Sequence, residues 1–309
     1  MQRKRFFWKL RDGEIPLGER TLVGGVVPVV PFAAADGNKY DDVERAYARA
    51  LMLEEQGADL ILLMGEVMRA GVTLSTAEEQ HRRLAPILKK LRQTVGVPIA
   101  VGTGRAETAS RALELGAAIV YDPSGLVFDP ALAKACANAN APLVVAHMRG
   151  SPVSWAKQAP SPDPVGHMMS DLEAGLHRAR MANLEKNQLM VDPGLGVGKR
   201  REESAQVAAR IFSLNRMELP ICVNAVAPGL LVEEPAGVSA AVATAAVMAA
   251  AHVVLAFDVP LVLGAVRAAD AITKAKEEDF TPPKEAPAPA RTRGPKRTPT
   301  AQGRWQRGQ

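Results

Sequence analysis

The sequence predicts an α/β fold in which a closed (β/α)8 TIM barrel precedes a basic C-terminal tail. One pattern recurs from residue 21 to 276: a short run rich in Val, Ile and Leu, a polar or glycine-containing loop, and an amphipathic stretch rich in Ala, Leu, Arg and Glu. The apolar runs do not alternate, which is typical of parallel strands buried on both faces. Eight such units in one series favour the barrel over the alternative, a doubly wound open sheet.

Each unit is recognised by its apolar run and by the helical period that follows it. The runs begin near Leu22, Leu60, Pro98, Ala118, Leu143, Gln188, Ile221 and His252. Helices are predicted at 40–56, 76–94, 105–115, 130–139, 167–185, 201–214, 238–250 and 261–275. Ser75 and Glu78 have the spacing of a capping box before the second helix, and Gly57 and Gly116 are placed to end the first and third. The proline-rich loop 149–166 is expected to form a lid.

The chain is expected to have three parts. They are an N-terminal lead-in at 1–20, a barrel domain at 21–276 and a Pro/Ala/Arg-rich tail at 277–309. Residues 281–309 contain seven Lys and Arg and one acidic residue, Glu285, which gives this segment a net charge of +6. Because the net charge of the whole chain is +5, residues 1–280 carry about −1. The body therefore lacks the charge pattern of a nucleic-acid binder. The composition of the tail predicts disorder. The alternative is that the tail binds RNA, an acidic partner or an anionic surface, because Trp305 lies between two arginines.

Composition excludes several classes of protein. Apolar residues make up 47% of the chain and charged residues 23%, which is typical of a globular domain, and aromatics at 4% leave aliphatic side chains to fill the core. Cys136 and Cys222 have no spacing that suggests a metal site or a disulfide, which favours a reducing, cytoplasmic setting. No apolar run reaches the length of a membrane span and no signal peptide is recognisable, so no membrane partner is expected.

The segment 192–199, with the sequence DPGLGVGK, is the motif with the clearest chemical meaning. Asp192 follows the apolar run 189–191, and three glycines after it allow a sharp turn and close approach to a bound group. In a (β/α)8 barrel the carboxyl ends of the strands carry the working groups. The motif predicts a ligand site, and an ordinary strand-to-helix turn is the alternative.

Similar short segments stand at the other predicted strand ends and in the lead-in. They are 6–10 and 17–21, Asp36-Gly37, Gly65-Glu66 with Arg69, 122–125, 147–152 and 192–199. In this order they resemble dihydropteroate synthase, the folate-pathway enzyme that displaces pyrophosphate from a dihydropterin with the amine of p-aminobenzoate. The resemblance covers residues 5 to 276 and implies a transferase barrel with a pterin pocket and an anion site at the strand ends.

The resemblance also implies which family residues this chain has replaced. Pro28 stands where the family has an Asn that helps to hold magnesium and the pyrophosphate, Gly102 replaces an Asp that contacts the pterin, and Tyr121 replaces an Asn that faces it. Met68, Pro228, Leu255 and Phe257 stand where the family has Thr, Lys, Arg and His. Only Asp192 of the pterin pocket and Arg69 of the phosphate-binding set are kept. The resemblance thus implies that the magnesium site is lost, and no cofactor is expected.

The residues left as candidates for binding a pterin or an anion share a position at a strand end. They are Asp192, Arg69, Lys199, Asp122, His147 and Arg149, and no catalytic residue is assigned. All but Lys199 have an alternative role: Asp192, and Asp122 with Ser124, as braces of their own loops, His147 as a hydrogen-bonded core residue, and the two arginines as solvated cations.

Three hypotheses follow for function. The favoured one is a divergent synthase paralogue, a candidate pseudoenzyme, that has lost most or all synthase activity and keeps residual pterin or folate binding. The second is an active synthase with a site rebuilt from Arg69, Arg149, Lys199 and a mobile loop. The third is a non-catalytic partner of a true synthase, packed through the Ala-rich stretch 238–251. The expected small-molecule partner is a pterin or a folate. The expected protein partner is a second copy of this chain, as a homodimer, or a true synthase, as a heterodimer.

Overall fold

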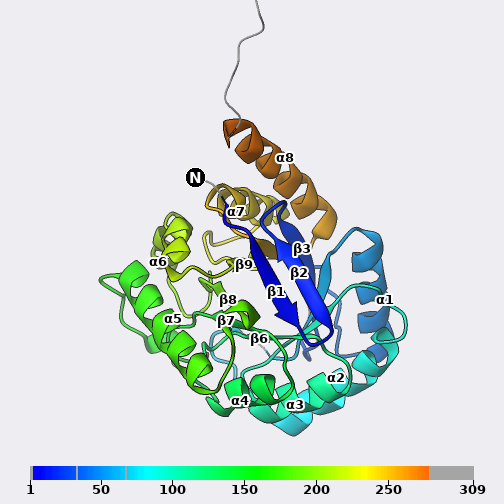
Figure 1. The fold of residues 1–309 in the computed structure, drawn as a ribbon. Coiled ribbons are helices and arrows are strands. Elements are labelled where there is room, and N and C mark those ends of the chain that lie inside the picture. Colours follow the sequence, from blue (N-terminus) through cyan, green and yellow to red (C-terminus); the bar gives the residue numbers. More distant parts are fainter. Residues whose placement is uncertain (1–2, 33, 67, 278–309) are drawn as a thin grey trace, which may run out of the picture. The chain divides into compact units, whose positions relative to one another are not determined.

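The computed structural model describes residues 3–32, 34–66 and 68–277, and within them eight parallel strands form one sheet. The strand order is β8-β7-β6-β5-β4-β3-β10-β9. A parallel bridge between Val191 and Ile221 joins the two outer strands and closes the sheet into a barrel with the helices around it (Figure 1). The predicted (β/α)8 barrel is confirmed. The tail predicted at 277–309 lies, beyond Glu277, outside the described residues.

The elements alternate along the chain as the sequence pattern predicts. The barrel strands are β3 (Leu22–Pro28), β4 (Leu60–Met64), β5 (Ile99–Gly102), β6 (Ile119–Asp122), β7 (Leu143–Ala146), β8 (Leu189–Asp192), β9 (Cys222–Asn224) and β10 (Val253–Ala256). The helices are α1 (Val43–Glu55), α2 (Ala77–Leu91), α3 (Ala106–Glu114), α4 (Ala131–Asn138), α5 (Pro164–Met181), α6 (Arg201–Ala208), α7 (Ala236–Met248) and α8 (Val259–Glu277). Short 3-10 turns are η1 (Trp155–Lys157), η2 (Lys186–Gln188) and η3 (Ile211–Met217).

Three local predictions need correction. The capping box of α2 is formed by Thr76 and Glu79, one residue after the predicted pair, because Thr76 is the residue with extended backbone at the helix start. Helix α5 begins at Pro164, whose fixed φ suits the first turn, so the proline-rich loop ends at Asp163. Helix α6 ends at Ala208, and η3 replaces the rest of the helix that was predicted to reach residue 214.

The lead-in forms a hairpin that the sequence pattern did not predict. Strands β1 (Phe6–Leu10) and β2 (Gly13–Leu17) pair in antiparallel register and lie across the amino-terminal end of the barrel (Figure 1). Trp8 is 1% exposed, packs with barrel-interior residues such as Leu60, and donates its indole N–H to the carbonyl of Gln188 at 3.3 Å. This end is therefore plugged, which leaves the carboxyl end, called the mouth below, for a site.

Burial divides into two layers around the strands. One apolar cluster lies between the strands and the surrounding helices, and a second, smaller one fills the barrel interior. No helix within the described ranges is both long and apolar enough to cross a bilayer. Cys136 and Cys222 are both free and buried.

Candidate active site at the barrel mouth

Asp192 ends β8 and is fully buried. Its Oδ1 accepts a hydrogen bond from the backbone N–H of Gly194 at 2.7 Å. Its Oδ2 accepts from the N–H of Asn224 at 3.0 Å and from the hydroxyl of Tyr121 at 3.3 Å. Burial raises the pKa of Asp192 to about 6, and these hydrogen bonds oppose that shift only in part. Both carboxylate oxygens are thus held by protein groups.

Tyr121, on β6 two strands away in the sheet, is the residue that covers this carboxylate. Its side chain is 3% exposed and packs in the interior with Ala100, Val144 and Leu255. Burial raises the pKa of the phenol well above its usual value, so the hydroxyl keeps its proton and donates it. The resemblance implies a smaller Asn at this position, and the phenol ring takes up the additional volume inside the barrel.

The glycines after Asp192 bring neighbouring loops into contact. Gly194 has φ +61°, and a Cβ there would lie 1.7 Å from the carbonyl oxygen of His147. Gly198 has φ +67°, and a Cβ there would lie 2.1 Å from the carbonyl oxygen of Arg149. Only glycine fits such close approach. In this structure the backbone that these glycines meet is that of the loop after β7.

Lys199 strengthens the same packing. Its ammonium donates to the carbonyl oxygens of Gly194 at 2.5 Å and of His147 and Val197 at 3.3 Å each. Burial lowers the pKa of Lys199 to about 7, against the raising effect of Asp192 and Glu203. The Lys199 ammonium is therefore already hydrogen-bonded to backbone carbonyls of two loops.

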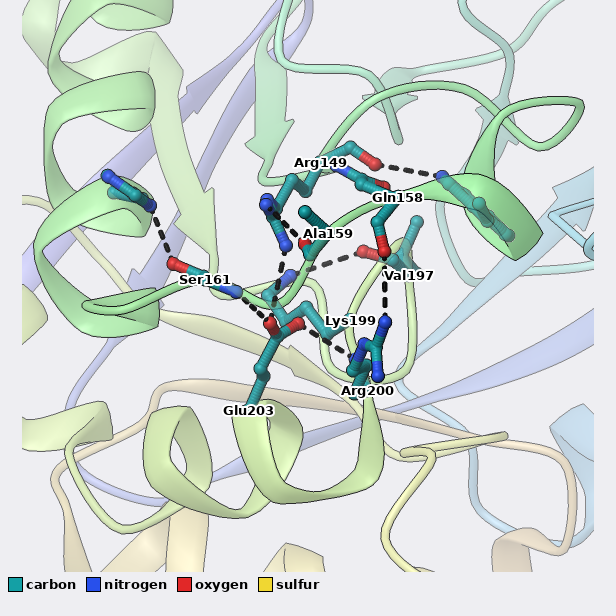
Figure 2. Close-up of polar contacts among 10 residues, drawn as sticks. Arg149, Gln158, Ala159, Ser161, Val197, Lys199, Arg200 and Glu203 are labelled. Carbon is teal, nitrogen blue, oxygen red and sulfur yellow. Dashed lines mark hydrogen bonds and ion pairs between the residues drawn. The ribbon is translucent and has the colours of Figure 1, made fainter.

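The loop after β7 reaches across the mouth. The carbonyl of Pro152 accepts a hydrogen bond from the N–H of Gly71, which follows β4, a strand three places from β7 in the sheet. Glu203 holds the other side: it accepts from the Arg149 guanidinium at 3.2 Å and from the N–H groups of Ser161 and Arg200 at 2.5 and 2.9 Å (Figure 2). One buried carboxylate thus fastens both ends of the loop to α6.

The substituted positions Pro28 on β3 and Gly102 on β5 form an uncharged wall with Met64 of β4 between them. Pro28 ends β3 opposite Met64 of β4, and Met64 pairs with Gly102 of β5. A Cβ on Gly102 would lie 2.2 Å from the sulfur of Met64. The methionine therefore fills the space in which the resemblance implies a carboxylate. Met68 lies further out, beside Arg149 and Arg200 in a cavity of about 290 Å³.

The other substituted positions are also without free charge. Leu255 is 3% exposed in the barrel interior, and Pro228 is buried in the loop after β9. Phe257 lies 4.4 Å from the guanidinium carbon of Arg49, which also donates to the Phe257 carbonyl. Arg69 is exposed, with its guanidinium 6.0 Å from the ring of Phe32.

Asp122 accepts three hydrogen bonds within its own loop. The donors are the N–H and hydroxyl of Ser124, both at 2.8 Å, and the N–H of Leu126 at 2.5 Å. Leu126 has φ +65°, a strained conformation for a leucine that these bonds help to hold. Burial raises the pKa of Asp122 to about 6. The geometry is that of a loop brace.

His147 forms a pair that sequence spacing did not reveal. Its Nε2 lies 3.1 Å from Oδ2 of Asp171 on α5, and burial lowers the pKa of His147 to about 4. The hydrogen bond to His147 lowers the pKa of Asp171, so a neutral imidazole donates to a carboxylate. Nδ1 of His147 has no hydrogen-bond partner among residues 3–32, 34–66 and 68–277. The only sequence signal for Asp171 is its place on a helix after a strand-end histidine.

The described part of the chain offers no group of three His, Cys, Asp or Glu side chains that could hold a metal ion. Pro28 has no side-chain donor at the position where the resemblance implies a magnesium ligand. The residues present therefore do not fit that metal, and no step of a reaction is assigned to it.

The comparisons with known proteins agree with this architecture. Residues 24–255 match the pterin binding enzyme family. Dihydropteroate synthase of Synechocystis sp. is 31% identical over 207 residues, 67% of this chain and 72% of that protein. The crystal structure of Yersinia pestis dihydropteroate synthase with a sulfonamide drug complex has a TM-score of 0.81 at 26% identity, covering 87% of this chain and 100% of that chain. The Clostridium difficile enzyme in the presence of pteroic acid has a TM-score of 0.75 at 28% identity, covering 83% and 98%. This chain belongs to the family of pterin-binding enzymes and is similar to its dihydropteroate synthases.

Proposed function

We propose that this chain is a pterin-binding-family barrel that no longer runs the normal synthase reaction and binds a pterin or folate only weakly near Asp192. One observation carries the proposal: the Asp192 carboxylate is fully buried and its two oxygens accept from Gly194, Asn224 and Tyr121. A ligand edge that donates to this carboxylate has to displace the Tyr121 hydroxyl and open the loops above it. A buried donor left without its acceptor costs about 1–3 kcal/mol.

The charges around the mouth support loss of the reaction. Release of pyrophosphate needs cations placed where negative charge develops, and a single such group is often worth about 2.7–4 kcal/mol. Lys199 is bound to three carbonyls and Arg149 to Glu203 and the carbonyl of Ala159. These contacts weigh against a site rebuilt from Lys199 and Arg149, so the active-synthase alternative is not favoured.

The decisive test is complementation of a bacterium that lacks its synthase, on medium without folate. We expect no growth with this chain and full growth with a true synthase expressed from the same vector at a matched protein level. Sustained growth would overturn the proposal. Growth only after the joint substitutions Tyr121→Asn, Gly102→Asp and Met64→Ala would support it, because two of them remove side chains that fill the pocket and Gly102→Asp restores the carboxylate that the resemblance implies.

Ligand binding is tested separately by calorimetry with pterin and pteroate. The solved relative in the presence of pteroic acid supports a ligand of this class. We expect weak heats that increase in Tyr121→Phe, which lacks the donated hydroxyl, and are absent in Asp192→Asn. Tight binding by the unaltered chain would contradict the proposed closure. A cytoplasmic location and association with a second copy or a true synthase belong to the same proposal.

A further inference from the structure

A separate cavity of about 410 Å³ lies beside the loop after β7, and Lys199 does not line it. The loop after β6, the end of β7 and helix α5 form its walls. Its apolar walls include Phe128, Met148 and Leu172, and Val127 is 59% exposed. Neither Asp192 nor Tyr121 lines it. It is therefore distinct from the position at which the family resemblance implies a pterin.

The polar side chains of this cavity present acceptors to a ligand. The hydroxyl of Ser124 donates to Asp122, that of Ser154 donates to the Ser151 carbonyl, and that of Ser151 donates to Ser154. Each hydroxyl proton is thus already committed within the protein, whereas hydroxyl oxygens have further acceptor capacity. A ligand that needs serine donors is disfavoured here.

The His147–Asp171 pair adds two stronger acceptors. The His147 side chain is 2% exposed, and its Nδ1 lacks a hydrogen-bond partner in the described part of the chain. With Nε2–H donated to Asp171, this Nδ1 is a lone-pair acceptor. The Asp171 side chain is 57% exposed, and only Oδ2 takes part in the pair with His147 among the described residues. A buried acceptor without a donor is uncommon in native proteins and points to a missing partner.

We propose that this cavity is a binding site for a small flat ring bearing an amino or amidine group. The ring lies against Phe128, Met148 and Leu172, and its N–H groups donate to Asp171 and to His147. Aromatic and aliphatic walls with a few convergent polar groups are the usual composition of small-molecule pockets, and the volume lies within their range. The carboxylate without a lining cation excludes acidic ligands. This site goes beyond the proposed function and does not depend on it.

The test uses 2-aminobenzimidazole as the probe, titrated by calorimetry into the full chain. Benzimidazole, which lacks the amino group, and benzoate are the matched ligands. We expect the amino compound to bind at least about tenfold more tightly than benzimidazole, since a hydrogen bond to a charged group contributes about 1.5–3 kcal/mol, and benzoate to give no heat. Equal binding of the two bases would overturn the proposal, and so would absence of any heat with the amino compound at millimolar concentration.

Variants locate the site. Asp171→Asn keeps an oxygen for the His147 hydrogen bond but removes the charge, and we expect at least about a tenfold loss of affinity. Val127→Trp, at an exposed position, should fill the cavity and abolish binding with little change in melting temperature. Glu173→Gln, on the exposed surface of α5, and Asp192→Asn should bind as the unaltered chain does. If Asp192→Asn abolishes binding and Asp171→Asn does not, the probe occupies the position near Asp192 and the proposal fails, whatever the outcome of complementation.

Discussion

Asp192 holds an ionisable carboxyl where water does not reach it, so its charge is costly at neutral pH. Its folded-state pKa of about 6 exceeds the ordinary value of 3.8. The stabilisation linked to this group is therefore fully present below about pH 4 and is lost as the pH rises through about 6. The same direction holds for Asp122, whose pKa is also raised to about 6 by burial.

We predict that Asp192→Asn removes this part of the pH dependence. Between about pH 4 and pH 6 the free energy of unfolding of the unaltered chain should fall relative to the variant, by on the order of 3 kcal/mol for a shift of about two pKa units. Urea unfolding of both proteins across this range measures the difference. Asp171→Asn is the control, because the lowered pKa of Asp171 places its effect below 3.8, with the opposite sign. A constant difference between the unaltered chain and Asp192→Asn would contradict the prediction.

Sequence alone placed Asp192 and Asp122 at strand ends but not the contacts that decide their roles. Tyr121 and Asp192 are 71 residues apart, and their hydrogen bond depends on two strands pointing side chains into one barrel. The glycines after Asp192 predict that another segment approaches them closely. Only the fold shows that the nearest backbone is that of His147 at Gly194, Ala227 at Gly196 and Arg149 at Gly198. His147 and Asp171 likewise lack a shared sequence signal.

Glu203 holds the loop after β7 at Arg149 and at Ser161. We predict that Glu203→Ala releases the loop, because Arg149 and the N–H of Ser161 both lose their acceptor. Trypsin should then cleave after Lys157, an exposed residue in η1, about tenfold faster, since local opening sets the cleavage rate. Mass spectrometry of the digest measures this.

Two variants separate loop release from general destabilisation. Glu202→Ala changes an exposed neighbour on the same helix and should leave the cleavage rate unchanged. Glu203→Gln keeps one acceptor oxygen and should give an intermediate rate. Equal rates for Glu203→Ala and Glu202→Ala would mean that the loop is held by its other contacts.

The β1–β2 hairpin is the second element whose role can be tested, because it closes the amino-terminal end of the barrel. We predict that Trp8→Ala destabilises the barrel by about 3–5 kcal/mol, because it empties the plugged end and removes the indole bond to Gln188. Thermal and urea unfolding measure the loss. Phe7→Ala, whose side chain is 62% exposed on the opposite face of the same strand, should cost less than about 1 kcal/mol. Similar losses for both variants would refute the plug.

Element prediction succeeded where a buried apolar run is followed by a helix and failed where no helix follows. All eight barrel strands begin within one residue of the predicted starts, because each is a buried run followed by a helix. The two hairpin strands have no helix between them and so gave no strand–helix repeat. The capping-box error arose because Ser75/Glu78 and Thr76/Glu79 satisfy the same spacing, and backbone geometry alone distinguishes them.

At the scale of the whole molecule, helix α7 presents a surface that is unusual for a water-exposed helix. Its sequence, AGVSAAVATAAVM, contains no charged residue, and Ala241, Ala245 and Met248 are exposed along one side. On the neighbouring helix α8, Leu261 is 38% and Ile272 56% exposed. An exposed helix surface without charge marks interaction sites more often than free surface. This observation supports the expected association of the chain through its Ala-rich stretch.

We predict that the barrel self-associates through α7 and that Ala241→Arg with Ala245→Arg produces a monomer. Two arginines on each protomer of a symmetric dimer bring four cations together in a desolvated interface, and α7 contains no acidic residue that could pair with them. Light scattering of the unaltered chain, at several concentrations, should give the mass of a dimer, and the double variant the mass of a monomer with an unchanged melting curve at low concentration. Ala174→Arg, at an exposed position on α5, controls for added surface charge and should remain dimeric. A monomeric unaltered chain that also fails to bind a true synthase would exclude α7 as an interface, and a dimeric double variant would place the contact elsewhere on the barrel.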